Sequence, residues 1–114
     1  MIRRNPRSEE KECYVDGEGI TQLVHILEKE DLKGHGRLYA KNTLLPGASI
    51  GWHVHHDEFE IYYILKGTAT YEDCDRTVSE ISAGTVTITG SEQGHSIANR
   101  TDENVEFIAI ILNT

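Results

Sequence analysis

Residues 47–67 read GASIGWHVHHDEFEIYYILKG, and this stretch predicts both a fold and a chemistry. His53 and His55 are two residues apart, so on a strand their side chains lie on the same face, one pleat repeat apart. Glu60 follows at an odd offset, but the polar triplet at 56–58 supplies a turn or bulge that lets it return to that face. Two imidazoles and one carboxylate are therefore expected to meet.

A second stretch, residues 84–99, reads GTVTITGSEQGHSIAN and carries a third histidine, His95, on another expected strand. An H-x-H pair alone is a weak signal, because histidine pairs also occur on surfaces. A carboxylate after a turn and a second ordered segment strengthen it. Imidazole and carboxylate donors suit a borderline divalent ion such as iron, manganese, nickel, copper or zinc. The alternative is a buried polar cluster or a surface cluster without metal.

At these residues the chain resembles the cupin superfamily. The first motif of that family is G-x5-H-x-H-x3,4-E-x6-G, and residues 47–67 match every fixed position with the four-residue spacer. The second motif is G-x5-P-x-G-x2-H-x3-N. Gly84, His95 and Asn99 match it, whereas Gly90 stands in place of the proline and Glu92 in place of the glycine. The resemblance covers roughly residues 36 to 112.

The resemblance implies an all-β fold, the antiparallel double-stranded β-helix (jelly-roll) of a cupin barrel. It also implies that His53, His55, Glu60 and His95 hold one divalent transition metal ion. These four would fill four positions of an octahedron and leave two adjacent ones open. Physical reasoning agrees, because a site with open positions is a catalytic arrangement, whereas a closed tetrahedron suits structural zinc.

Length and composition independently favour one β domain. The chain has 114 residues, ten glycines and two prolines, with many short apolar runs. We expect an N-terminal arm at 1–19 and a single barrel domain at 20–114. The formal charge of −8 argues against nucleic-acid binding. The N-terminus does not resemble a signal peptide and no run is long enough to span a membrane, so we expect a cytoplasmic protein.

Turn residues separate a series of short strand-like runs. Residues 20–27 are ambiguous between a helical stripe and a strand, and we favour a strand. Residues 105–112 are almost all apolar and β-branched, which predicts a central strand buried on both sides. The remaining expected strands are 37–44, 49–55, 59–66, 68–72, 76–82, 85–89 and 95–100.

Three other residues are candidates for the pocket. Tyr62 alternates with Glu60, so it should face the pocket, either as a catalytic proton donor or simply as core. Arg37 and Tyr39 share a face of an earlier strand. If that face is internal they could bind a substrate carboxylate or phosphate, and if it is external they are ordinary surface residues.

The outward positions are also informative, because they are apolar. If His53 and His55 point inward, then Ile50, Trp52 and Val54 point outward. The same reasoning for the next strand sends Phe59, Ile61, Tyr63 and Leu65 outward. Soluble monomers avoid such patches, so we expect a cover, either a second copy in a homodimer or the N-terminal arm.

Two functional hypotheses follow. The first is a metal-dependent enzyme acting on a small molecule, either a dioxygenase or an isomerase, epimerase or lyase. The second is a non-catalytic module that binds or senses a small molecule through the same metal. A purely structural barrel is a third option, but it has no need of four convergent ligands.

Overall fold

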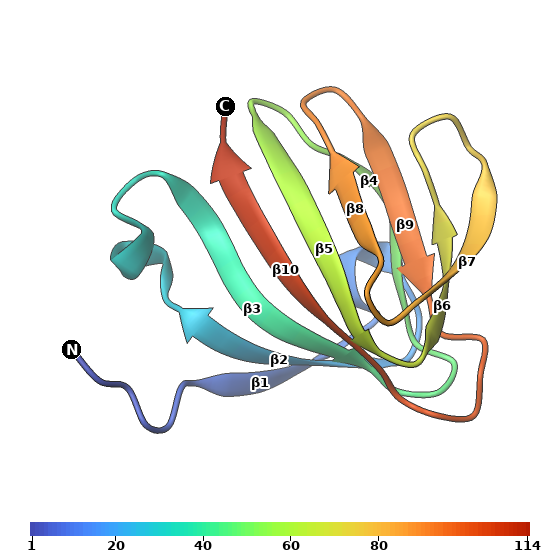
Figure 1. The fold of residues 1–114 in the computed structure, drawn as a ribbon, viewed down its shortest axis with the longest axis horizontal. Helices are drawn as coiled ribbons and strands as arrows, with labels where there is room; N and C mark the ends of the chain where they lie inside the picture. Colours follow the sequence, from blue (N-terminus) through green and yellow to red (C-terminus); the bar gives the residue numbers. More distant parts are fainter.

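The computed structural model describes residues 1–114, which form two antiparallel β-sheets facing each other (Figure 1). The larger sheet has the strand order β1-β2-β3-β10-β5-β8, and the smaller has the order β4-β9-β6-β7. The jelly-roll expected from the sequence is confirmed. The strands are β1 (Ser8–Glu12), β2 (Ile20–Leu27), β3 (Gly36–Leu44), β4 (Ser49–Val54), β5 (Glu58–Lys66), β6 (Thr68–Glu72), β7 (Val78–Ser82), β8 (Val86–Thr89), β9 (Gly94–Ala98) and β10 (Val105–Asn113).

The core lies between the two sheets and follows strict alternation. On β10, Val105, Phe107, Ala109 and Ile111 are buried, while the residues between them are half-buried. Alternation of this kind is what a strand with one fully buried face produces. β10 is central, as predicted, since it pairs with both β3 and β5. Its outer face, however, is only partly covered.

The N-terminal residues join the larger sheet. Residues 20–27 form strand β2, as favoured above, and β1 pairs with β2 antiparallel at the edge of the sheet. Between them the chain forms a short 3₁₀ helix, η1 (Tyr14–Asp16), which packs against β4. A second 3₁₀ helix, η2 (Lys29–Leu32), lies in the charged turn before β3. Neither helix has the length and apolar character needed to cross a membrane.

The expectation that Ile50 points outward is wrong. Ile50 is only 3 % exposed and belongs to the core. The pairing of β4 with β9 shifts register between Ile50 and His53. A bulge of this kind adds a residue and reverses which face the following side chains occupy. Consequently Ile50 and His53 both line the same cavity, although they are three residues apart.

Candidate metal centre

Strand pairing brings His53 and His95 together. His53 lies on β4 and faces His95 on the neighbouring strand β9, where the two residues are directly paired. His55 follows the end of β4, and Glu60 lies on β5 in the opposite sheet. One nitrogen from each histidine and one oxygen of Glu60 all lie within 4.8 Å of one another. The four residues selected from the sequence therefore converge between the sheets.

The ligand atoms lie close enough together for one metal ion to be held by all four residues. Glu60 Oε1 lies 3.0 Å from His55 Nε2, 2.9 Å from His95 Nε2 and 3.7 Å from His53 Nε2. His95 Nε2 lies 3.0 Å from His53 Nε2 and 3.2 Å from His55 Nε2. With bonds of about 2.1 Å, neighbouring ligands are about 3.0 Å apart in an octahedron and about 3.4 Å apart in a tetrahedron. Three of the five distances are nearer to the octahedral value, the 3.2 Å between His95 and His55 lies midway, and the 3.7 Å between Glu60 and His53 exceeds both.

The opposite nitrogen of each imidazole is held by a partner. His53 Nδ1 donates to the Gly51 carbonyl at 2.7 Å, and His55 Nδ1 donates to Glu58 Oε1 at 2.9 Å. His95 Nδ1 lies 2.9 Å from Tyr71 Oη and 2.8 Å from Thr89 Oγ1. A carbonyl and a carboxylate can only accept, so the proton of His53 and His55 is placed on Nδ1.

This anchoring leaves the Nε2 lone pairs directed at the common centre. Metal-binding histidines are oriented in the same way, by donating their second ring N–H to a carbonyl or carboxylate. The residues present therefore fit a divalent transition metal ion, which His53, His55, Glu60 and His95 would hold.

The side chains of the cluster shift one another's pKa values in different directions. Burial favours a raised pKa for Glu60, but its contacts with His53, His55 and His95 outweigh this and lower the pKa. Burial lowers the pKa of His95, which keeps its imidazole neutral. At His55, burial lowers the pKa but the contacts with Glu60 and Glu58 outweigh it and raise the pKa. A metal ion that bound His55 would therefore have to displace a proton, which makes binding pH-dependent.

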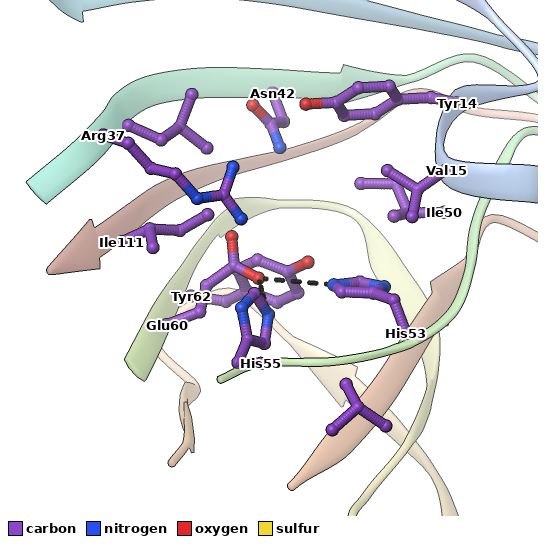
Figure 2. Close-up of a pocket in the computed structure, with 12 residues that line it drawn as sticks. Tyr14, Val15, Arg37, Asn42, Ile50, His53, His55, Glu60, Tyr62 and Ile111 are labelled. Atoms are coloured by element: carbon purple, nitrogen blue, oxygen red, sulfur yellow. Dashed lines mark hydrogen bonds and ion pairs between the residues drawn. The ribbon is translucent and has the colours of Figure 1, made fainter. Parts of the chain in front are cut away.

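A cavity of about 190 Å³ opens beside the cluster (Figure 2). Tyr62 lies in its wall, almost fully buried, with its ring stacked on that of His95 at a centroid distance of 5.0 Å. Burial and the nearby Glu60 raise its pKa well above the usual value, so the phenol keeps its proton. The lining residues are Tyr14, Val15, Arg37, Leu38, Asn42, Ile50, His53, Val54, His55, Glu60, Tyr62 and Ile111.

Arg37 and Tyr39 do not share a face as expected. The pairing of β3 with β10 is irregular opposite Leu112, which pairs with Gly36 while Ile111 pairs with Leu38. Arg37 sits at this bulge and lines the cavity, whereas Tyr39 does not. Tyr39 alternates with the buried Ala40 and so lies on the other face of β3.

Glu58 is a site residue that the sequence did not predict, because the polar triplet at 56–58 indicates only a turn or bulge. Its carboxylate accepts two hydrogen bonds of 2.8 Å from the Arg37 guanidinium as well as the one from His55 Nδ1. Arg37 first, and His55 in addition, hold the pKa of Glu58 at about 2. Glu58 thus holds both the His55 imidazole and the Arg37 guanidinium in place. Glu58 lies two residues before Glu60, and residues two apart on a strand share a face, so this spacing was the sequence signal that could have predicted its role.

The turn that departs from the second motif is closed by other contacts. The backbone N–H of Gly90 donates to Gln93 Oε1 at 2.8 Å, and that of Glu92 donates to the His55 carbonyl at 2.6 Å. Glu92 takes a positive φ of 65°. These contacts replace the turn that proline and glycine would shape, and His95 still pairs with His53.

Comparison with known protein families decides the assignment. Residues 41–111 match the family model described as a cupin domain, which is more than half of the chain. The chain belongs to the cupin family. Asn99 fits this assignment, since its side chain donates to the Leu44 and Glu103 carbonyls and ties the end of β9 to neighbouring loops.

Both a curated protein and a crystal structure from Thermotoga maritima are similar to this cupin. A protein named oxalate-binding protein is 43 % identical over 96 residues, which cover 84 % of this chain and 78 % of the relative. A crystal structure described as a predicted oxalate decarboxylase superposes with a TM-score of 0.93 at 37 % identity and covers 100 % of both chains.

More distant structures share only the fold with this cupin. A sugar phosphate isomerase of Silicibacter pomeroyi, at 22 % identity, has a TM-score of 0.70 and covers 90 % of this chain and 63 % of its own.

Proposed function

We propose that this cupin binds one divalent transition metal ion through His53, His55, Glu60 and His95, and binds a small dicarboxylate of the oxalate class beside it. The observation that carries the proposal is the convergence of four ligands whose imidazoles are anchored at Nδ1, three of which, His53, His55 and Glu60, line a small cavity. When bound, the metal supplies a local positive charge that attracts carboxylate oxygens. The name of the relative that is 43 % identical supports the ligand class.

The cavity matches such a guest in size and charge. Its volume of about 190 Å³ corresponds to roughly six water molecules, which suits a guest of a few carbon atoms. The Arg37 guanidinium lies in the cavity wall, where its Nε and Nη2 are paired with Glu58. The remaining nitrogen, Nη1, is left to donate a charge-assisted hydrogen bond to a carboxylate guest.

Binding without turnover is the role that the lining residues favour. Catalysis on a carboxylate needs a proton donor or acceptor within reach of the guest. The carboxylates at the cavity are both engaged, because Glu60 contacts the three histidines and Glu58 is paired with Arg37 and His55. No free carboxyl group or fourth histidine lines the cavity.

A metal-dependent enzyme is the second candidate, and Tyr62 is the observation that favours it. Its phenol lies in the cavity wall, and burial together with Glu60 raises its pKa. A phenol that keeps its proton at that position could donate a hydrogen bond to charge that develops on a bound guest during a reaction at the metal. In this case a Tyr62→Phe variant would lose turnover while still binding the guest.

Titration calorimetry tests the main proposal. We expect protein loaded with Mn²⁺ or Co²⁺ to bind oxalate at least roughly 100-fold more tightly than protein stripped with a chelator, because the metal provides most of the attraction. Acetate, with one carboxylate, serves as the control guest. Equal binding by loaded and stripped protein, or none by either, would contradict the proposal. Formate or carbon dioxide released from the same samples would favour the enzyme.

We further propose that a second copy of this cupin covers the outer face of β5 and β8. That face carries exposed apolar side chains, namely Tyr63, Leu65, Val86 and Ile88. Exposed contiguous apolar side chains of this kind mark interaction surfaces. The N-terminal segment is the other expected cover, but β1 pairs at the far edge of the sheet, beside β2, and leaves these side chains exposed.

Light scattering after size exclusion checks the dimer. We expect a mass of twice the 12.8 kDa of one chain for the natural protein. The Ile88→Lys variant should shift to a single chain, because the symmetric interface would bury two uncompensated charges. Val78→Lys is the matched control, since Val78 is 60 % exposed against 65 % for Ile88 but lies on the smaller sheet. A natural protein with the mass of one chain would refute the dimer.

A further inference from the structure

Two polar side chains in the cavity wall, Asn42 and Tyr14, have no part in the metal cluster. Figure 2 shows both on the side of the cavity away from His55, with the Asn42 amide nitrogen turned toward the cavity. Asn42 lies on β3 between the buried Ala40 and Leu44, and is itself only 1 % exposed. Tyr14 comes from η1.

Neither side chain has a partner at the cavity. Asn42 Oδ1 is buried without any hydrogen bond, and none joins Asn42 or Tyr14 to another residue drawn in Figure 2. Burial, with a contribution from Glu60, raises the pKa of Tyr14, so its hydroxyl remains a donor. Buried polar groups are nearly always hydrogen-bonded, and an unmade bond is costly. Asn42 Oδ1 lacks a donor, whereas the donors that face the cavity are the Asn42 amide nitrogen and the Tyr14 hydroxyl, and neither makes a hydrogen bond within the chain. These two donors are free to bind acceptor atoms of a guest in the cavity.

We propose that Asn42 and Tyr14 form a recognition subsite for the end of the guest that points away from the metal. This inference rests on the proposed function. A dicarboxylate that offers some of its oxygens to a metal ion retains others that only accept hydrogen bonds. Asn42 Nδ2 and Tyr14 Oη are donors on the facing wall, and the Arg37 guanidinium beside them adds positive charge. The subsite thus selects carboxylate guests over ions that merely bind metal.

The N-terminal segment is built to hold Tyr14 in place. Cys13, Val15 and Asp16 adopt positive φ values of 51°, 50° and 58°, which non-glycine residues seldom do and β-branched valine least of all. Such backbone strain persists only where the surroundings impose it, and it is concentrated at functional sites. Here the surroundings are strand β4, which approaches this segment closely at Gly51. A side chain at position 51 would not fit, because its Cβ would lie 2.5 Å from the Val15 carbonyl oxygen.

Absorbance titration of the Co²⁺-loaded protein tests this subsite with two probes. Oxalate carries carboxylate oxygens that can reach the subsite, whereas azide binds metal ions through one terminal nitrogen and offers only a single, weaker nitrogen acceptor at its other end. We expect Asn42→Leu and Tyr14→Phe each to weaken oxalate binding about tenfold, the effect of one lost hydrogen bond to a charged group. Azide binding should stay within about twofold of the natural protein. Asn104→Leu, at an exposed loop position, and Tyr39→Phe, a half-buried tyrosine on the face of β3 away from the cavity, are the matched controls.

The outcomes separate the two proposals. Tyr14→Phe removes one oxygen atom from a half-buried side chain, so we expect that variant to fold as the natural protein does. If both variants bind oxalate as tightly as the natural protein, the subsite is refuted while the proposed function stands. Equal loss of oxalate and azide binding would also refute it, because the effect would then lie at the metal. If the natural protein takes up azide but not oxalate, the proposed function fails and the subsite falls with it.

Discussion

Replacing Glu60 by glutamine is expected to lower the affinity for Mn²⁺, Co²⁺ or Zn²⁺ by more than about 100-fold. Loss of a residue that merely supports a ligand costs about 10- to 100-fold, and Glu60 is itself the expected carboxylate ligand. It is also the one ligand that carries a full negative charge, and its Oε1 is nearest to His55 and His95. Glutamine keeps the shape but removes the charge. Elemental analysis and competition with a metal-sensitive dye measure the change.

A matched control makes that experiment specific. Glu80→Gln makes the same chemical change on β7, where the side chain is exposed and far from the cluster. It should retain one metal ion per chain. His53→Ala should lose metal as Glu60→Gln does, because each removes one of the four ligands. Stoichiometric metal in both Glu60→Gln and His53→Ala would contradict the ligand assignment.

Removing the metal is expected to lower the Tm by about 15 °C without changing the far-UV circular dichroism spectrum. A ligand that binds only the folded state, present at about 1,000 times its Kd, stabilises by about 4 kcal/mol. For a domain of this size each 1 kcal/mol moves the Tm by about 4 °C. The β-sheet signal should persist because the core between the sheets, including Phe107 and Ile64, does not involve the cluster. Scanning calorimetry with and without a chelator measures the shift.

The same scan on Glu60→Gln distinguishes specific from general effects. That variant should melt at one temperature whether metal or chelator is present, because its site no longer prefers the folded state. A metal-dependent Tm that survives in Glu60→Gln would mean that the ion acts elsewhere on this acidic chain, which has a formal charge of −8.

Much of the fold was predictable because alternation and turn residues are local signals. The nine expected strands between residues 20 and 113 are all present. The inward alternation of Glu60, Tyr62 and Ile64 on β5 is confirmed by their burial. The metal cluster was predictable as well, because its residues fall in two motifs with defined spacing, and the structure brings them together.

The rest of the site was not predictable because it depends on irregular pairing and on long-range contact. A bulge on β4 places Ile50 in the cavity, and another beside Gly36 separates Arg37 from Tyr39. Strand parity read from sequence fails at such points, since one extra residue exchanges the two faces. Tyr14 reaches the cavity only because η1 packs on β4. No local sequence pattern predicts the contact between η1 and β4.

Anomalous diffraction from a crystal grown with Co²⁺ or Mn²⁺ tests the central claim most directly. Data collected at the absorption edge of the ion should give one strong peak between the two sheets, within about 2.0–2.4 Å of one nitrogen from each of the three histidines and of a Glu60 oxygen. The absence of a peak at this position, with His53, His55 and His95 still bonded only to one another and to Glu60, would contradict it.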